Sequence, residues 1–234
     1  MSKYKYVIFD CDGVLVDSEP ISIQILVDLA NSYGANIDLA YGMTHFKGSF
    51  FVACKQRISK LTQTILPDTL EDDYRQRSFE AFKKGMKPIE GVKEVIKSLT
   101  IPFCVASSGP KNKIKLNLEL AGLLPYFENK IFSCYDIQKW KPDPAIFILA
   151  AKTMGFHPSE CIVIEESISG VQASLNGGFD VFGFTAHDYN NELQGTATKT
   201  FNKLSQLLEL IQKALGFFNS FTLIGITSIR LKSA

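Results

Sequence analysis

Residues 6–19 read YVIFDCDGVLVDSE, and this stretch sets the expected fold. A strand is predicted at 6–10, because its first four side chains are bulky and apolar, as in strands buried on both faces. Asp10 and Asp12 come next, and residues two apart leave a strand on the same side. Gly13 then lets the backbone turn sharply. The stretch therefore predicts a buried strand that ends in two neighbouring carboxylates.

Further short apolar runs alternate with helical patterns along the chain. They predict strands at 103–106, 130–133, 161–165 and 181–184. Helices are expected at 111–121, 144–154, 168–176 and 204–215. Strands that alternate with helices in this way form right-handed βαβ units. We therefore expect an α/β protein with a doubly wound parallel sheet.

A long helical stretch interrupts this alternation after the first strand. Segments 21–34, 50–65 and 70–85 carry the 3.6-residue period of amphipathic helices. The simplest interpretation is a small all-helical cap inserted between the first strand and its crossover helix at 91–99. We predict a core formed by 1–17 and 88–215, a cap at 18–87, and a C-terminal extension of unknown role at 216–234.

The C-terminal segment 214–229 contains no charged residue. It is shorter than the roughly 20 residues that span a bilayer, and glycine and polar residues interrupt it. A packed extension is the first interpretation, and an interfacial or partner-binding segment is the alternative.

Charge and cysteine content narrow the class of protein. With 25 basic and 24 acidic residues the formal net charge is +1, which gives no electrostatic reason to expect nucleic acid or an anionic membrane as partner. The five cysteines include no CxxC pair and are odd in number, so we expect buried thiols in a reducing compartment. The N-terminus lacks the apolar core of a signal peptide. We expect a cytoplasmic protein without a membrane span, as a monomer or weak dimer.

Polar residues gather where the expected strands end. In an open parallel sheet, ligands bind at the carboxyl ends of the strands. The residues at these ends are Asp10 and Asp12, Ser107 and Ser108, 139–141, and Glu165 and Glu166. Two pairs of carboxylates, a hydroxyl and a lysine should therefore meet in one crevice.

Asp10 and Asp12 indicate a chemistry as well as a place. Close carboxylates repel one another unless a cation compensates, and Mg²⁺ prefers carboxylate, carbonyl and phosphate oxygens. A carboxylate can attack phosphorus, and a second can protonate the leaving alcohol and then activate water. A turn with two solvated acids would show the same short pattern, so the pair alone does not distinguish a catalytic site from a surface turn.

Four ordered segments together resemble the haloacid dehalogenase superfamily. The first motif of that family reads DxDGxxxDS, as residues 10–18 do here. Residues 105–108 (VASS) resemble the second motif, 140–144 (WKPDP) the third, and 164–171 (IEESISGV) the fourth. The resemblance covers residues 6–185 and implies the family's Rossmann-like core with a helical cap.

The resemblance implies roles for individual residues. Asp10 would be the nucleophile and a Mg²⁺ ligand, and Asp12 would be the general acid/base, its main-chain carbonyl also touching the metal. Ser107 and Lys141 would bind the transferring phosphoryl group, and Lys141 would also orient Asp10.

Glu165 and Glu166 would complete the metal ligands in this resemblance. Many relatives carry Asp where this chain has Glu166, so the longer side chain must retract or its loop must shift. Either change would weaken metal binding.

The resemblance favours a phosphatase acting on a small phosphorylated metabolite. Asp12 argues against a dehalogenase, which lacks that residue. The β-phosphoglucomutase branch carries Thr and His where this chain has Val16 and Ser22, and the loss of that pair favours hydrolysis. Segments 105–113 and 135–145 resemble a bacterial subgroup active on 6-phosphogluconate and similar sugar phosphates. The alternatives are phosphoryl transfer of the mutase type and a non-catalytic relative that binds a phosphorylated metabolite.

Cap residues are expected to select the substrate. His45 and Lys47 are the candidates on a cap loop, to be joined in the core by Ser107, Ser108, Gly109 and Lys141. Arg75 and Arg77 lie on a charged helix face and are expected to be solvated.

Overall fold

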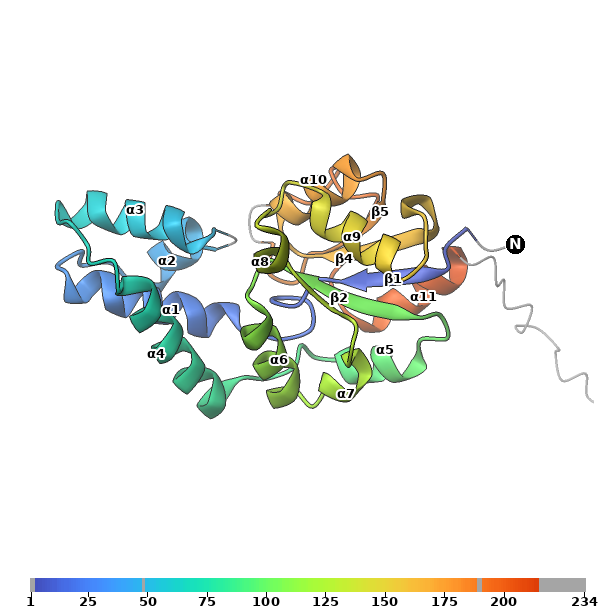
Figure 1. Cartoon of the computed structure of the whole chain (residues 1–234), viewed down its shortest axis with the longest axis horizontal. Coiled ribbons are helices and arrows are strands. Elements are labelled where there is room, and N and C mark those ends of the chain that lie inside the picture. Colours follow the sequence, from blue (N-terminus) through green and yellow to red (C-terminus); the bar gives the residue numbers. More distant parts are fainter. Residues whose placement is uncertain (1–2, 48, 189–190, 215–234) are drawn as a thin grey trace, which may run out of the picture.

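The computed structural model describes residues 3–47, 49–188 and 191–214. Its centre is a six-stranded sheet with the order β3-β2-β1-β4-β5-β6, in which every neighbouring pair is parallel (Figure 1). The strands are β1 (Tyr6–Phe9), β2 (Phe103–Ser107), β3 (Ile131–Ser133), β4 (Cys161–Glu165), β5 (Asp180–Phe184) and β6 (Lys199–Phe201). The predicted doubly wound parallel sheet is confirmed.

Helices cover both faces of the sheet (Figure 1). One face packs against α5 (Val92–Ser98), α6 (Lys111–Leu120), α7 (Leu124–Phe127) and α11 (Ser205–Ala214). The other packs against α8 (Cys134–Ile137), α9 (Ala145–Thr153) and α10 (Ile168–Asn176), and the short 3₁₀ helix η1 (Pro158–Glu160) precedes β4. This arrangement accounts for the near-continuous apolar character of the strands, because both faces are buried.

Strand β1 lies at the centre of the sheet and contributes to both cores. Val7 and Phe9 belong to the cluster on one face, and Tyr6 and Ile8 to the cluster on the other. All four side chains are fully buried. Phe9 pairs with Val105 of β2 and with Ile164 of β4. Asp10, the next residue, is therefore held at the carboxyl edge of the sheet between two neighbouring strands.

Four helices form a separate body beside the sheet, at the left of Figure 1. They are α1 (Glu19–Ser32), α2 (Leu39–His45), α3 (Phe51–Thr62) and α4 (Leu70–Gly85). These helices share an apolar cluster of their own, which includes Ile23, Phe46 and Ile58. Sequence periodicity gave no separate signal for α2, which is the shortest of the four.

The chain passes between the two bodies at two adjacent points. Asp17 N donates to Lys87 O at 2.9 Å, and Ile89 N donates to Leu15 O at 3.1 Å. The outgoing and returning segments are thus tied together. The division into a core of 1–17 and 88–215 and a cap of 18–87 remains our proposal, and this pairing supports it.

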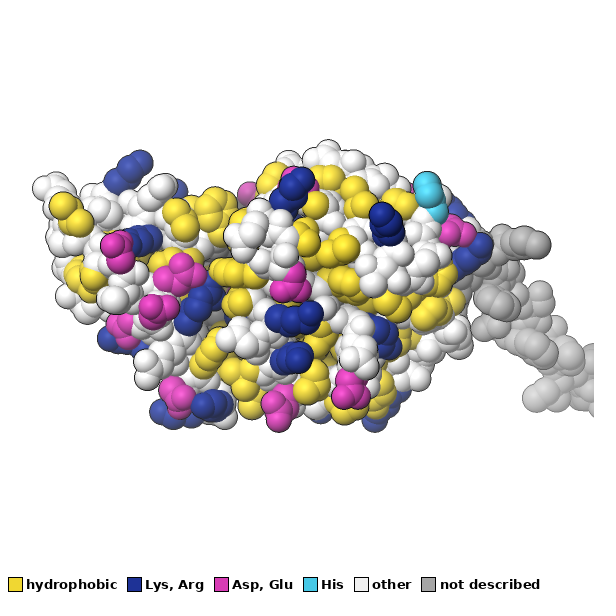
Figure 2. Space-filling model, viewed as in Figure 1, with side chains coloured by type: hydrophobic (Ala, Val, Ile, Leu, Met, Phe, Trp, Pro, Cys, Tyr) yellow, Lys and Arg dark blue, Asp and Glu magenta, His cyan; other side chains and the backbone are white. Residues whose placement is uncertain are grey.

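Several other expectations concern the surface and the cysteines. All five cysteines are free and buried. Within the described ranges, none of the helices combines the length and apolar character that a bilayer span requires. Basic and acidic side chains are interspersed on the face shown in Figure 2. The extension at 216–234, and all but the first residue of the apolar segment 214–229, lie outside the described residues.

The packing of α1 on α2 can be tested at a glycine. A Cβ added to Gly42 would lie 2.7 Å from methyl carbons of both Ile23 and Val27, whereas at Gly85 it would lie 3.7 Å from Ile21. We expect Gly42→Ala to destabilise the protein by about 1–3 kcal/mol through overpacking. Gly85→Ala, at the end of α4, should be neutral or stabilising by up to about 1 kcal/mol, because alanine favours helix. Urea denaturation of the two variants measures the difference, and equal midpoints would contradict the packing described.

Candidate active site

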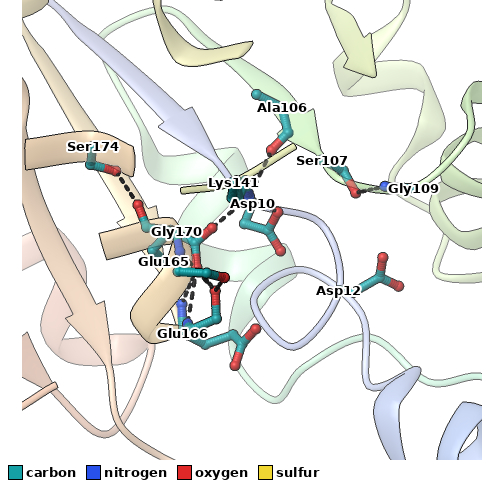
Figure 3. A network of polar contacts seen from close by, with 12 residues as sticks. Asp10, Asp12, Ala106, Ser107, Gly109, Lys141, Glu165, Glu166, Gly170 and Ser174 are labelled. Carbon is teal, nitrogen blue, oxygen red and sulfur yellow. Dashed lines mark hydrogen bonds and ion pairs between the residues drawn. The ribbon is translucent and has the colours of Figure 1, made fainter. Parts of the chain in front are cut away.

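The carboxyl edge of the sheet meets the cap at a cavity of about 210 Å³. Asp10 follows β1, Ser107 ends β2, Glu165 ends β4, and Lys141 lies between α8 and α9. All four side chains line this cavity. The convergence predicted from the strand ends is therefore present in the structure (Figure 3).

Lys141 is the centre of the most buried polar group in the cavity. Its Nζ lies 2.5 Å from Asp10 Oδ1 and 2.5 Å from Glu165 Oε1. The three side chains are 4%, 8% and 0% exposed respectively. Burial by itself would lower the pKa of Lys141, but the two carboxylates outweigh burial and raise the pKa. Lys141 therefore stays charged and fixes one oxygen of Asp10.

The pKa of Asp10 is raised as well, and in a carboxyl group a raised pKa favours the neutral form. Burial raises the pKa of Asp10 to about 7, the charge of Lys141 opposes the rise, and the charges of Glu165 and Asp12 add to it. Lys141 contacts Oδ1 of Asp10, and Oδ2 has no hydrogen-bond partner among the described residues that line the cavity. The second oxygen can therefore meet a ligand or a cation.

Glu165 connects this group to the first turn of α10. Its Oε2 accepts hydrogen bonds from Glu166 N at 2.9 Å and from both N and Oγ of Ser167 at 3.0 Å. A Cβ on Gly170 would lie 1.9 Å from Oε1, so only glycine fits there. Both oxygens of Glu165 are thus engaged by protein groups. The metal-ligand role predicted for Glu165 from the sequence stays a prediction, and a cation there would share Oε1 with Lys141.

Asp12 lies apart from this group, and its carboxylate points elsewhere (Figure 3). Oδ1 accepts hydrogen bonds from Ser18 Oγ and from Asn117 Nδ2 at 3.0 Å, and Lys113 Nζ is 2.8 Å away. Burial acts to raise the pKa of Asp12, but the charge of Lys113 and these hydrogen bonds lower it overall. Asp12 is therefore held ionised and in one orientation.

Sequence reasoning assigned no role to Lys113 or Asn117. They are four residues apart on α6, so one helix face presents both to Asp12. The four-residue spacing was the available signal in the sequence. It indicates a shared contact with Asp12 only when α6 is known to face the end of β1.

Glu166 occupies the space above a glycine of the first motif. A Cβ on Gly13 would lie 2.8 Å from Glu166 Cγ. Oε2 of Glu166 is buried and has no hydrogen-bond partner in the described part of the chain, and Lys47 Nζ is 3.7 Å away. Burial raises the pKa of Glu166 well above its usual range, and the charges of Glu19 and Glu165 add to the rise. A cation bound beside this carboxylate would offset the charges of Glu19 and Glu165.

Lys47 reaches this acidic region from the cap. Its Nζ lies 3.3 Å from Glu19 Oε2 and donates to His187 O at 2.8 Å. The structure thus places Lys47 in the cavity, as predicted for a substrate-binding residue. His45, predicted beside it, does not line the cavity, since its ring packs 4.3 Å from that of Tyr41. A substrate-binding role for His45 stays a prediction, and in this structure its ring packs on Tyr41 of the same helix.

Ser107, Ser108 and Gly109 form the core wall facing the cap. All three line the cavity. Oγ of Ser107 accepts a hydrogen bond from Gly109 N at 3.1 Å, so its own hydrogen can be donated to a ligand. This turn can therefore bind an anion through a hydroxyl group.

The residues fit a magnesium ion that keeps water and substrate ligands. In the described ranges, no three Asp, Glu, His or Cys side chains form a ready metal cluster. Mg²⁺ is usually held by one or two carboxylates, with waters and a phosphate completing its shell. Asp10 and Glu166 supply two such carboxylates, and the orphaned oxygen of Glu166 is the observation that favours a cation here.

The chain is similar in sequence to known hydrolases. Residues 4–178 match the family model of the haloacid dehalogenase-like hydrolases. The chain is 37% identical over 211 residues to a 6-phosphogluconate phosphatase of Escherichia coli, with 90% of this chain and 96% of that protein covered. It is 29% identical over 193 residues to a phosphorylated carbohydrates phosphatase of Thermotoga maritima, with 79% and 87% covered.

Solved structures show the same architecture. A haloacid dehalogenase-like protein of unknown function from Agrobacterium tumefaciens superposes with a TM-score of 0.81 at 28% identity, covering 90% of this chain and 98% of that one. A hydrolase of the same family from Deinococcus radiodurans, with bound phosphate and sodium, gives 0.76 at 27% identity and covers 92% and 97%.

Lys141 should be essential to the stability of the site. Lys141→Met would leave two buried carboxylates without their cation, and we expect a loss of about 3–5 kcal/mol in the free energy of unfolding. Lys139→Met is the matched control, because the Lys139 side chain is 59% exposed and its nearest carboxylate oxygen, on Asp143, is 3.7 Å away. Urea denaturation should show a large shift for the first variant and none for the second. A similar midpoint for both would mean that Lys141 does not organise the site.

Proposed function

The chain belongs to the haloacid dehalogenase-like hydrolase family, and we propose that it is a magnesium-dependent phosphatase acting on a phosphorylated sugar or sugar acid. The observation that carries this proposal is the Lys141–Asp10 pair at the end of β1, which holds one oxygen of Asp10 and presents the other to a cavity that Ser107 also lines. A fixed carboxylate beside a lysine and a hydroxyl donor suits phosphoryl transfer, which depends mainly on positioning and charge neutralisation.

The first chemical step would use both aspartates. Oδ2 of Asp10 attacks phosphorus, an Asp10–phosphorus bond forms, and the bond from phosphorus to the ester oxygen breaks. Asp12, ionised in the free protein, would take up a proton from solvent when the substrate phosphate binds and give that proton to the leaving alcohol. Lys141 and the hydroxyl of Ser107 would bind oxygens of the phosphoryl group during the transfer.

The second step would return the enzyme to its starting state. Asp12 takes a proton from water as that water attacks phosphorus, and the Asp10–phosphorus bond breaks to release inorganic phosphate. The contacts from Lys113, Asn117 and Ser18 keep Asp12 ionised and oriented in the free protein, which suits this role as a base.

Mg²⁺ would be held by Asp10, Glu166 and the main-chain carbonyl of Asp12. A bound magnesium ion supplies charge neutralisation to the phosphoryl oxygens. Lys47 lies near Glu166 in this structure and would share that carboxylate with the metal.

The substrate class follows from relatives and from cavity size. The relatives from E. coli and T. maritima are named for 6-phosphogluconate and for phosphorylated carbohydrates. The cavity of about 210 Å³ is below the ~300–1,000 Å³ typical of drug-sized ligands, which suits a small metabolite. Val16 is fully buried and Ser22 lines the cavity, so these two positions do not supply the threonine and histidine of the mutase branch. These features support hydrolysis of a sugar or sugar-acid phosphate.

Phosphate release tests the mechanism directly. Wild type should release phosphate from 6-phosphogluconate or a related sugar phosphate only when Mg²⁺ is present. Asp10→Asn should lower kcat by at least about 10³-fold, because the amide cannot act as the nucleophile. Asp28→Asn, on the exposed surface of α1, is the control and should leave kcat unchanged. Wild-type protein that binds these compounds without releasing phosphate would instead be a binding relative.

Thermal denaturation tests the metal ligands without turnover. Mg²⁺ should raise the wild-type Tm, because a ligand that binds only the folded state stabilises it by mass action, about 2.7 kcal/mol at 100 times Kd. Glu166→Gln should lose most of this rise, while Glu128→Gln, at an exposed position, should keep it. An undiminished rise in Glu166→Gln would exclude Glu166 as a ligand.

A further inference from the structure

Arg75 lines the cavity, although its sequence position on a charged helix predicts a solvated side chain. It lies on α4, and the face of this helix that carries Tyr74, Ser78 and Phe82 also lines the cavity. Arg77, two residues further on, behaves as predicted: its side chain is 49% exposed and pairs with Asp73 on the helix surface. The two arginines thus lie on different sides of the same helix, and Arg75 belongs to the wall that the cap contributes to the cavity.

The guanidinium of Arg75 is held in a fixed orientation across the boundary between cap and core. Its Nη2 lies 2.5 Å from Tyr135 Oη, in α8 of the core. Nε donates to Glu71 Oε1 at 3.0 Å, and Nη2 also donates to that oxygen. An arginine has five N–H donors, and these contacts use three of them. In the described part of the chain, the two donors on Nη1 have no acceptor.

The charge partners distinguish Arg75 from the other basic residues of the cavity. Lys141 is paired with Asp10 and Glu165, and Lys113 with Asp12.

Lys47 is likewise paired with acids inside the cavity, namely Glu19 and Glu166. Arg75 is paired instead with Glu71, whose side chain is 36% exposed and which does not line the cavity. A pair with a solvent-exposed carboxylate is weak, so the cationic character of Arg75 is the least compensated of the four.

The wall around Arg75 is rich in hydroxyl groups. Ser22, Tyr74 and Ser78 line it together, and Oγ of Ser78 is buried without a hydrogen-bond partner among the described residues. Hydroxyl groups can both donate and accept, so they suit the hydroxyls of a sugar chain. A planar guanidinium at the end of such a wall suits a carboxylate, which it can bind through two hydrogen bonds.

We infer that Arg75 is a specificity-determining residue that binds a carboxylate at the end of the substrate remote from the phosphate. This inference rests on the proposed phosphatase function and narrows its substrate class to sugar-acid phosphates. The phosphate lies at Asp10 and Lys141, the hydroxylated chain lies along Ser22 and Ser78, and the carboxylate meets Nη1 of Arg75. Because Arg75 also contacts Tyr135 of the core, the same side chain joins cap closure to recognition of the substrate end.

A pair of substrates that differ only at that end tests the assignment. 6-Phosphogluconate carries a carboxylate where glucitol 6-phosphate carries a hydroxymethyl group. Arg75→Met should lower kcat/KM for 6-phosphogluconate about 10- to 100-fold, the range expected for hydrogen bonds to a charged group, mainly through KM. The same variant should change kcat/KM for glucitol 6-phosphate less than about 3-fold. Arg75→Lys should recover part of the loss, because it restores the charge but not the two-pronged contact. Arg77→Met, on the outer face of the helix, should leave both substrates unchanged.

The outcomes separate this inference from the proposed function. An equal loss for both substrates in Arg75→Met would make Arg75 a support of the closed cap and overturn the inference. A wild-type enzyme with no preference for the carboxylated substrate would also overturn it while leaving the phosphatase intact. Absence of phosphate release from every phosphorylated compound tested would overturn the proposed function, and the inference with it.

Discussion

The salt bridge of Lys141 with Asp10 and Glu165 is the constraint on which the site depends. A lysine that is 4% exposed can keep its charge only if carboxylates replace the lost water, and the two carboxylates tolerate burial only with the lysine between them. The same salt bridge also positions the residues before α10. Glu165 accepts hydrogen bonds from the backbone N–H groups of Glu166 and Ser167, and its carboxylate lies against Gly170. One charge balance thus fixes the end of β1, the end of β4, the start of α10 and the loop before α9.

Cap and core have complementary roles around this centre. The core supplies Asp10, Asp12 and Glu166 to the cavity, whereas Lys47 and Arg75 come from the cap. Each of these two basic residues also contacts a group of the core, Lys47 beside Glu166 and Arg75 at Tyr135. The cap is therefore held closed by the same side chains that a substrate would meet. A bound substrate must therefore either replace these contacts or share them. The cap residues would then select the substrate, and the core residues would carry out the reaction.

Sequence patterns predicted the sheet and the strand-end residues because both follow from local rules. Buried parallel strands are short apolar runs, and ligands gather at their carboxyl ends, so Asp10, Ser107 and Lys141 could be placed without any contact being known. Strand β6 was missed, since its three residues lie at the sheet edge and only the last is buried. Lys113 and Arg75 were missed for another reason. Their roles depend on which helix face meets which strand end, and periodicity does not contain that information.

The two adjacent glutamates, Glu165 and Glu166, show a limit of prediction from sequence. Neighbouring residues at a strand end point to opposite sides, but the sequence assigned both Glu165 and Glu166 to the metal and did not reveal which acid turns inward to Lys141. The structure answers this through Gly13, whose missing side chain leaves the space that Glu166 Cγ occupies. The additional methylene of glutamate is therefore accommodated over the glycine of the first motif. The longer side chain thus lies against Gly13, its Oε2 is buried without a hydrogen-bond partner among the described residues, and it lines the same cavity as Asp10, which is the arrangement that the proposed metal site requires.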